Sequence, residues 1–129
     1  MLKTVYGQVT TTPDVAAEYG EPLPDWVSIM EVENKSKQLL LELQIHKGES
    51  SAIALAIEIV GSTIILDDYK ARRIAHQLGL NYIGMIGIIV KAKLTGIIHS
   101  IKPVLEKIKQ TEFRLSLELE EEALRLANE

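Results

Sequence analysis

The chain has 129 residues, of which 47% are hydrophobic and 25% charged, and its formal net charge is −4. These values are typical of a folded globular domain and exclude wholesale disorder. The negative charge also excludes binding of nucleic acid by bulk positive charge, although an enzyme that meets a phosphodiester through a bound metal ion remains open.

Cysteine is absent from the chain. Its absence excludes disulfides, thiol catalysis and cysteine-ligated zinc, and it fits a cytoplasmic location. The longest uninterrupted apolar run, Ile83 to Val90, contains two glycines and is too short to cross a bilayer. No charged-then-apolar signal segment opens the sequence, so we expect a cytoplasmic protein without membrane segments.

The first third of the chain predicts short helices and strands in alternation. Thr12-Pro13 is a typical helix start, and segment 20–25 holds two prolines and a glycine and is therefore a loop. We expect Leu39, Leu40 and Leu43 to face inward from their helix. In order, the expected elements are a helix ending at Gly7, a strand over Gln8–Thr11, a helix over Pro13–Tyr19, a strand over Trp26–Val32 and a helix over Asn34–Gln44.

The stretch Gly48–Arg73 has the clearest pattern in the sequence. Apolar residues from Ala52 to Val60 recur at the three- and four-residue spacing of one helix face, and Gly61 ends that helix. Thr63–Leu66 is then a continuous run rich in β-branched residues. Such a run is typical of a strand that is buried on both faces of a parallel sheet.

The remainder of the chain predicts one more helix–strand pair and then three helices. In the last helix we expect Leu119, Ala123 and Leu126 on one face and the acidic run 120–122 on the solvated face. These elements are helices over Asp68–Leu78, Met85–Thr95, Ile101–Gln110 and Ser116–Ala127, and a strand over Leu80–Ile83. Helices alternating with strands predict an α/β fold with a short parallel sheet between helical layers. We expect one domain over residues 1–129, with residues 85–129 as its C-terminal helical layer.

Three acidic residues of the stretch Gly48–Arg73 are expected to meet at one edge of the sheet. A helix that precedes a parallel strand runs antiparallel to it, so Glu49 at the helix start projects near Asp67 and Asp68 at the strand end. Open α/β sheets bind their ligands at this edge. Three converging carboxylates repel one another unless a cation lies between them, and oxygen ligands suit Mg²⁺ or Mn²⁺.

The same residues also have a purely structural interpretation. Asp67 or Asp68 is a good N-cap for the following helix, and Glu49 is a favourable first-turn charge against the helix dipole. Spacing alone leaves these two interpretations about equally open.

Several short motifs, taken in their order and spacing, resemble one family along the whole chain. They are Thr12-Pro13 with Glu18, Gly48-Glu49 with residues 52–56, Ile65-Leu66-Asp67-Asp68 with Ala71-Arg72, Leu78-Gly79-Leu80, Ile83-Gly84, Ala92-Lys93 and Ile101-Lys102-Pro103. This series is similar to the PIN-domain superfamily, and within it to a prokaryotic branch grouped with VapC-like toxins. The resemblance implies a three-layer α/β/α fold.

PIN domains are metal-dependent nucleases, commonly endoribonucleases of toxin–antitoxin pairs. The resemblance therefore implies a Mg²⁺- or Mn²⁺-dependent ribonuclease with RNA as its substrate and an antitoxin protein as a partner. It implies that Glu18, Glu49, Asp67 and Asp68 form the catalytic set, in which Glu49, Asp67 and Asp68 bind the metal. The metal would activate water and stabilise charge on the phosphate oxygens.

The sequence departs from the family at its front. Family members begin with a central strand that ends in a metal-binding aspartate, whereas this chain begins in the end of the helix that follows, about 20 residues later. We therefore expect impaired catalysis. The missing strand leaves a gap in the sheet where unpaired backbone groups are costly, so we expect the remaining strands to close up in another order, or a second chain to fill the gap in a homo-oligomer.

Two other functions remain open from the sequence. The chain could be a non-catalytic module that binds an antitoxin or a second copy of itself, or, much less favoured, a receiver-like domain, which would need a phosphoacceptor aspartate after a later strand. The basic residues of helices 68–78 and 85–95 could steer RNA toward the acidic edge or simply cover solvated faces. These are Lys70, Arg72, Arg73, Lys91 and Lys93.

Overall fold

The computed structural model describes residues 2–111 and 113–129, so the first residue of the chain, at the start of the expected N-terminal helix, lies outside the described residues. The chain forms two compact units. One unit is the continuous segment Gln8–Gly84, which we call the strand unit. The other combines the N-terminal residues up to Gly7 with Met85–Glu129, and we call it the helical unit.

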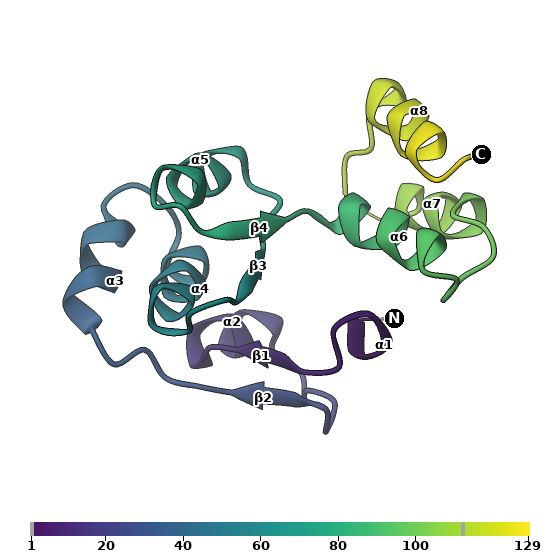
Figure 1. The fold of residues 1–129 in the computed structure, drawn as a ribbon. Helices are drawn as coiled ribbons and strands as arrows, with labels where there is room; N and C mark the ends of the chain where they lie inside the picture. The colour runs from purple at the N-terminus through teal and green to yellow at the C-terminus, as the bar shows by residue number, and fades with distance from the viewer. Residues whose placement is uncertain (1, 112) are drawn as a thin grey trace. The chain divides into compact units, whose positions relative to one another are not determined.

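The strand unit contains the elements in the order that the sequence predicts. Local signals set their ends: the Thr12 hydroxyl caps α2, Gly20 ends it with a positive φ, and Asp68 caps α5. The elements are β1 (Val9–Thr11), α2 (Pro13–Tyr19), β2 (Val27–Ile29), α3 (Lys35–Glu42), α4 (Lys47–Glu58), β3 (Thr63–Ile65), α5 (Tyr69–Gln77) and β4 (Asn81–Ile83) (Figure 1).

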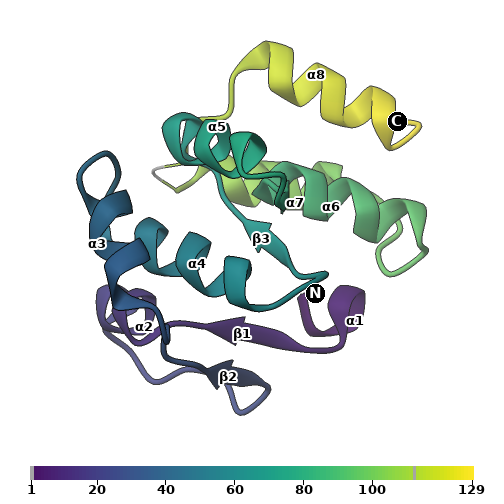
Figure 2. The same ribbon diagram turned by 60° about the vertical axis from the view of Figure 1, so that its left-hand side comes forward.

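The strands form two separate parallel pairs within the described residues. β1 pairs with β2, with Val9 opposite Val27, and β3 pairs with β4, with Thr63 opposite Asn81. The parallel α/β architecture is therefore confirmed, but the strands do not close up into one sheet, and that alternative was wrong. Figure 2 shows β1 between β2 and β3, and within the described residues β1 is hydrogen-bonded only to β2 and β3 only to β4. A second chain in this place stays a prediction.

The core of the strand unit lies between α4, α5 and the β3–β4 pair. Ile53 and Ala71 are fully buried there, and Ile64 and Leu66 are nearly so. A smaller cluster of Val32, Ala54 and Leu55 lies on the other side of α4. α4 thus contributes to both apolar clusters, which fixes its position and the direction in which its first turn projects.

Three expectations about which side chains are buried were wrong in this unit. Leu39, Leu40 and Leu43 are 63%, 65% and 80% exposed, because α3 turns Gln38 and Leu41 inward instead. Val60 lies beyond the end of α4 and is 98% exposed. β3 is not buried on both faces: Ile64 points into the core and Ile65 is 40% exposed, because the apolar cluster covers one face of the strand.

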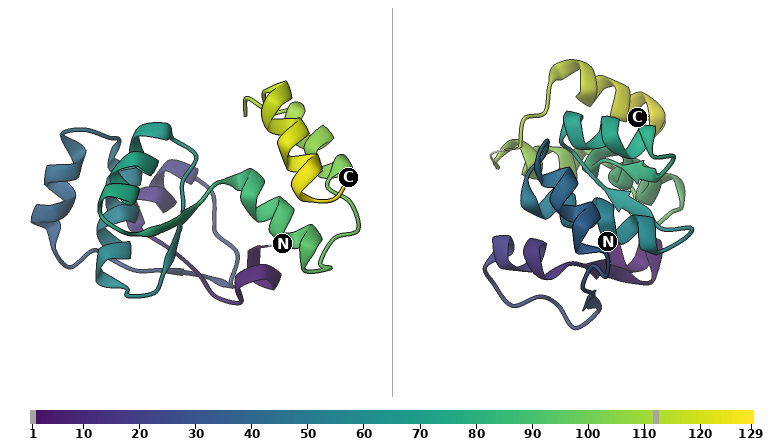
Figure 3. Two further views of the ribbon diagram at one scale, coloured as in Figure 1. Left: turned by 45° about the horizontal axis from the view of Figure 1, so that its top comes forward. Right: turned by 90° about the vertical axis from the view of Figure 1, so that its left-hand side faces the viewer.

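The helical unit packs its helices around one apolar core. Its elements are α1 (Leu2–Tyr6), α6 (Met85–Leu94), α7 (Lys102–Lys109) and α8 (Leu117–Leu126). Ile89, Ile101 and Leu105 are almost completely buried against Ala123, and the left view of Figure 3 shows α8 beside α6 and α7. Leu119 and Leu126 remain 38% and 46% exposed, so two of the three residues expected on the buried face of α8 were wrong. Glu120, expected on the solvated face, pairs with Lys109 of α7 and its side chain is 18% exposed.

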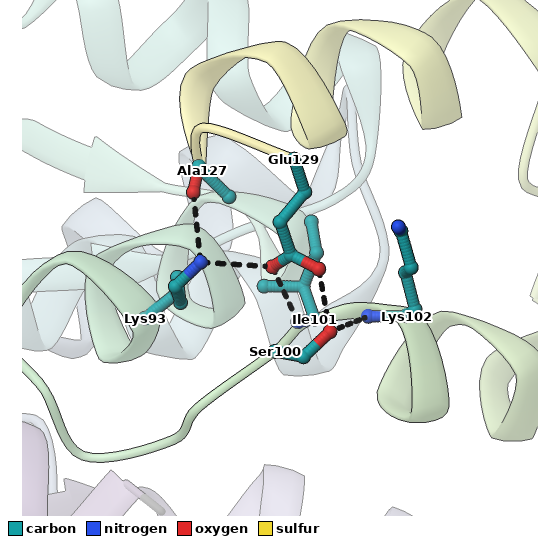
Figure 4. A network of polar contacts seen from close by, with 6 residues as sticks. All are labelled: Lys93, Ser100, Ile101, Lys102, Ala127 and Glu129. Carbon is teal, nitrogen blue, oxygen red and sulfur yellow. Dashed lines mark hydrogen bonds and ion pairs between the residues drawn. The ribbon is translucent and has the colours of Figure 1, made fainter.

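A polar network joins the end of the chain to the start of α7 (Figure 4). The Glu129 carboxylate accepts hydrogen bonds from the Ser100 hydroxyl and, at 2.8 Å, from the Ile101 N–H, and it pairs with Lys93 at 3.2 Å. Lys93 also donates to the Ala127 carbonyl at 3.0 Å. A carboxylate at this position offsets the unpaired N–H groups and the positive end of the α7 dipole.

We expect this network to make the stability of the helical unit depend on pH. The hydrogen bond from Ser100, then that from Ile101 and the charge of Lys93, lower the pKa of Glu129 from 4.5 to about 2. Because the folded-state pKa is depressed, the stabilisation is present above pH 4.5 and is lost as the pH falls toward 2. The free energy of unfolding, measured with urea, should fall more between neutral and acidic pH for the wild type than for Glu129→Gln. Glu121→Gln, on the exposed side of α8, should keep the wild-type dependence.

Candidate active site

Glu18 lies against the first turn of α4. It occupies the last turn of α2, and a Cβ added to Gly48 would meet its Oε1 at 2.6 Å and its Oε2 at 2.7 Å. Real Cβ atoms do not approach other atoms this closely, so the absence of a side chain at residue 48 gives the carboxylate its place. The N–H groups of a helix first turn favour negative charge. The fold thus brings Glu18 next to Glu49.

A buried chain of hydrogen bonds fixes α2 against α4. The Val15 N–H donates to the Thr12 hydroxyl at 3.2 Å, and the Thr12 and Ser51 hydroxyls lie 2.6 Å apart. Ser51 donates its hydrogen to the Gly48 carbonyl at 2.7 Å, so Thr12 must be the donor in the hydroxyl pair. Both hydroxyl side chains are almost completely buried. The chain of bonds therefore ends on the same glycine that the Glu18 carboxylate contacts.

Glu49 is electrostatically coupled to the other acidic residues. Its pKa is raised, first by burial, then by the negative charge of Asp68, with a further contribution from Glu18. His46 acts in the opposite direction. Carboxylates from α2 and from the end of β3 are therefore close enough to disfavour the charge of Glu49.

Asp68 has the structural role that the sequence allowed and also a place at the acidic edge. Its Oδ2 accepts a hydrogen bond from the Ala71 N–H at 2.9 Å, which makes it the N-cap of α5. This bond fixes the orientation of the carboxylate at the end of β3.

Asp67 points toward the end of the neighbouring strand. A Cβ added to Gly84, directly after β4, would lie 3.1 Å from Asp67 Oδ1 and 3.8 Å from Arg72 Nη1. The close approach of two side chains at residue 84 accounts for a glycine there. Asp67 therefore lies beside a guanidinium group.

The donor atoms fit a hard divalent cation, but they are not gathered around one point. Within the described parts of the chain, no group of three or more acidic or histidine side chains is arranged to hold a metal ion. Carboxylate oxygens are nevertheless the ligands that Mg²⁺ and Mn²⁺ prefer, and mutual repulsion at Glu49 is what a cation would relieve. Glu18 and Asp68 both lie near Glu49, whereas Asp67 lies on the side of β4, next to Gly84.

Sequence reasoning did not single out Gly48 or the partner of Arg72. The signal for Gly48 was a glycine inside a helix, which costs about 1 kcal/mol relative to alanine and so indicates a close approach. The partner of Arg72 is Tyr82. The guanidinium carbon of Arg72 lies over the Tyr82 ring, 5.3 Å from the ring centroid. That contact joins α5 to β4 and has no signature in local sequence.

Searches of curated proteins and of solved structures returned no match. No helix in the described residues has the length and apolar character of a membrane span. A family model described as a PIN domain matches residues 1–129, which is the whole chain. The matched family is the one that the motifs and the order of helices and parallel strands indicate, and the chain belongs to the PIN domain family.

Proposed function

We propose that this chain is a metal-dependent endoribonuclease with Glu18, Glu49, Asp67 and Asp68 as its active residues. The observation that carries the proposal is the convergence of acidic groups from three segments. Glu18 lies on the first turn of α4, and the charges of Asp68 and Glu18 both raise the pKa of Glu49 in that turn. A carboxylate whose pKa is raised by burial and by neighbouring acidic groups, as that of Glu49 is, is more typical of a functional site than of a solvated surface. Membership of the PIN family supports a nuclease-like activity.

The positions of these residues support their proposed roles to different degrees. Glu49, Asp67 and Asp68 would hold Mg²⁺ or Mn²⁺, with Asp67 reaching the ion from the side of β4. The ion would supply an activated water and stabilise charge on the phosphate. The N-cap bond of Asp68 keeps its carboxylate at the end of β3. Glu18, held over Gly48, would orient groups at the start of α4. We further propose that the protein acts in the cytoplasm, on RNA, as the toxin of a toxin–antitoxin pair.

The direct test is cleavage of single-stranded RNA by the purified chain with Mg²⁺, with Mn²⁺ and with excess chelator. We expect cleavage with either ion and none with chelator, and calorimetry should detect Mn²⁺ binding that Glu49→Gln and Asp67→Asn weaken. Absence of both cleavage and Mn²⁺ binding would contradict the proposal. Slow cleavage with intact Mn²⁺ binding is the result expected of a chain with impaired catalysis.

The second candidate function is a binding module, and the exposed leucines of α3 favour it. Leu39, Leu40 and Leu43 are all more than 60% exposed on one short helix, which is unusual for large apolar side chains on a monomer. The partner that we propose for this surface is a second copy of the chain, with an antitoxin as the competing occupant. If so, sedimentation of the wild-type protein without metal should give a dimer. The double variant Leu40→Gln, Leu43→Gln should be a monomer under the same conditions. A stable monomer without cleavage would contradict both functions.

A further inference from the structure

One of the basic residues near the acidic edge is held in a defined position. The Arg72 guanidinium carbon lies 5.3 Å from the centroid of the Tyr82 ring, and the Arg72 Nη1 and Asp67 Oδ1 atoms both lie within 4 Å of the same point at Gly84. An arginine stacked on an aromatic ring keeps its charge and loses much of its rotamer freedom. Arg72 is therefore fixed next to a predicted metal ligand.

Tyr82 is itself held from two sides. His76 contacts its ring edge-on, with the ring centroids 6.3 Å apart, and Tyr82 packs against the core cluster of the strand unit. Arg72 and His76 are one turn apart on α5, so they lie on the same face of the helix and enclose the ring. The ring is thus a rigid support for the guanidinium.

The other basic residues considered from the sequence lie in different surroundings. Arg73 and Lys70 are exposed on α5, as Arg72 is, but Arg72 also lies over the Tyr82 ring. Lys91 lies over the Tyr6 ring at 4.6 Å and Lys93 pairs with Glu129, and both belong to the helical unit. The contacts therefore distinguish Arg72 from residues that add only positive charge to the surface.

We propose that Arg72 binds a backbone phosphate of the RNA next to the carboxylates, and that Tyr82 is the positioning residue for its guanidinium. This inference rests on the proposed ribonuclease function. Guanidinium groups bind phosphate through paired N–H donors, which a lysine does not reproduce. A fixed positive charge also allows a polyanion to approach an edge that is otherwise negative.

The test measures the affinity of the protein for a short unstructured single-stranded RNA by fluorescence anisotropy. Ca²⁺ replaces Mg²⁺ in this measurement so that the RNA is bound without being cleaved. We expect Arg72→Gln to weaken binding about tenfold and to reduce the slope of log K against log salt by about one, as the loss of one phosphate contact requires. Arg72→Lys should recover little of the affinity. The matched control, Arg73→Gln, removes the same charge one residue away and should change the affinity by no more than about twofold.

The Tyr82→Leu variant removes the ring that positions the Arg72 guanidinium but leaves the charge of Arg72 in place. We expect it to weaken RNA binding about threefold, and the double variant with Arg72→Gln to bind no more weakly than Arg72→Gln alone, because both changes remove one interaction. A purely structural role would lower the melting temperature of Arg72→Gln without changing its RNA affinity, which would overturn the inference.

Three further outcomes also contradict the inference. Equal losses for Arg72→Gln and Arg73→Gln in a wild type that binds and cleaves RNA would overturn the role of Arg72 and leave the ribonuclease function intact. A wild type that neither binds nor cleaves RNA would overturn both. A tenfold loss without a change in salt slope would assign Arg72 to a base instead of a phosphate.

Discussion

Replacing Gly48 with alanine is expected to reduce RNA cleavage by about 100-fold while the protein remains folded. The new methyl group would lie 2.6 Å from Glu18 Oε1 and 2.7 Å from Oε2, so the carboxylate must leave the first turn of α4. The Glu18 side chain is flexible and can move without displacing the backbone. Alanine also favours a helix over glycine by up to about 1 kcal/mol, so thermal unfolding should show little loss of stability.

A double-mutant cycle shows whether Gly48→Ala acts through Glu18. Glu18→Gln alone should also reduce cleavage, and the combination with Gly48→Ala should be no slower than the slower single variant. Additive losses would mean that the methyl group disturbs something other than Glu18. Full activity of Gly48→Ala would show that the position of Glu18 is irrelevant to catalysis.

The Thr12→Val variant is expected to lose about 2–4 kcal/mol of folding stability. Valine has nearly the shape of threonine, so the buried site remains filled, but two hydrogen bonds disappear. The Val15 N–H loses its cap and the buried Ser51 oxygen loses its donor. The Ser51 oxygen keeps its own bond to the Gly48 carbonyl, so the expected loss comes from the missing donor at Ser51 together with the uncapped Val15 N–H.

Urea unfolding of Thr12→Val and Thr12→Ser measures this contribution. Serine keeps the hydroxyl and removes one methyl group, so Thr12→Ser should cost about 1 kcal/mol. A Thr12→Val variant that is as stable as the wild type would show that the hydroxyl chain contributes nothing. In the expected case, Thr12→Val also loosens α2 against α4, and its RNA cleavage should fall more than that of Thr12→Ser.

The order of the elements, and the helix starts that a capping residue sets, could be predicted because they depend on neighbouring residues. Thr12, Asp68 and Ser116 cap their helices through bonds to the N–H three residues later, and α2 begins and ends at the expected residues. The convergence of Glu49 with Asp68 also followed from local lengths, since a helix and the strand after it run in opposite directions. The metal-binding role of these residues stays a prediction.

The rotation of a helix about its axis could not be predicted where a contact distant in sequence decides it. In α3 the leucines give a strong apolar pattern, yet Gln38 is turned inward and donates to Asp14 Oδ2 of α2 at 2.8 Å. Asp14 also pairs with Lys47 at 3.6 Å, so the polar contact joins three helices. Such a contact outweighs the apolar periodicity of one short helix, and it is absent from the local sequence.

The division of the chain has a consequence for its biosynthesis. The strand unit is one uninterrupted segment, whereas the helical unit needs the residues before Gly7 together with those after Gly84. On the ribosome, the strand unit can fold as soon as it emerges, while α1 must wait for α6 to be translated. Folding is therefore sequential, and a premature stop after Gly84 would leave α1 without its packing partner.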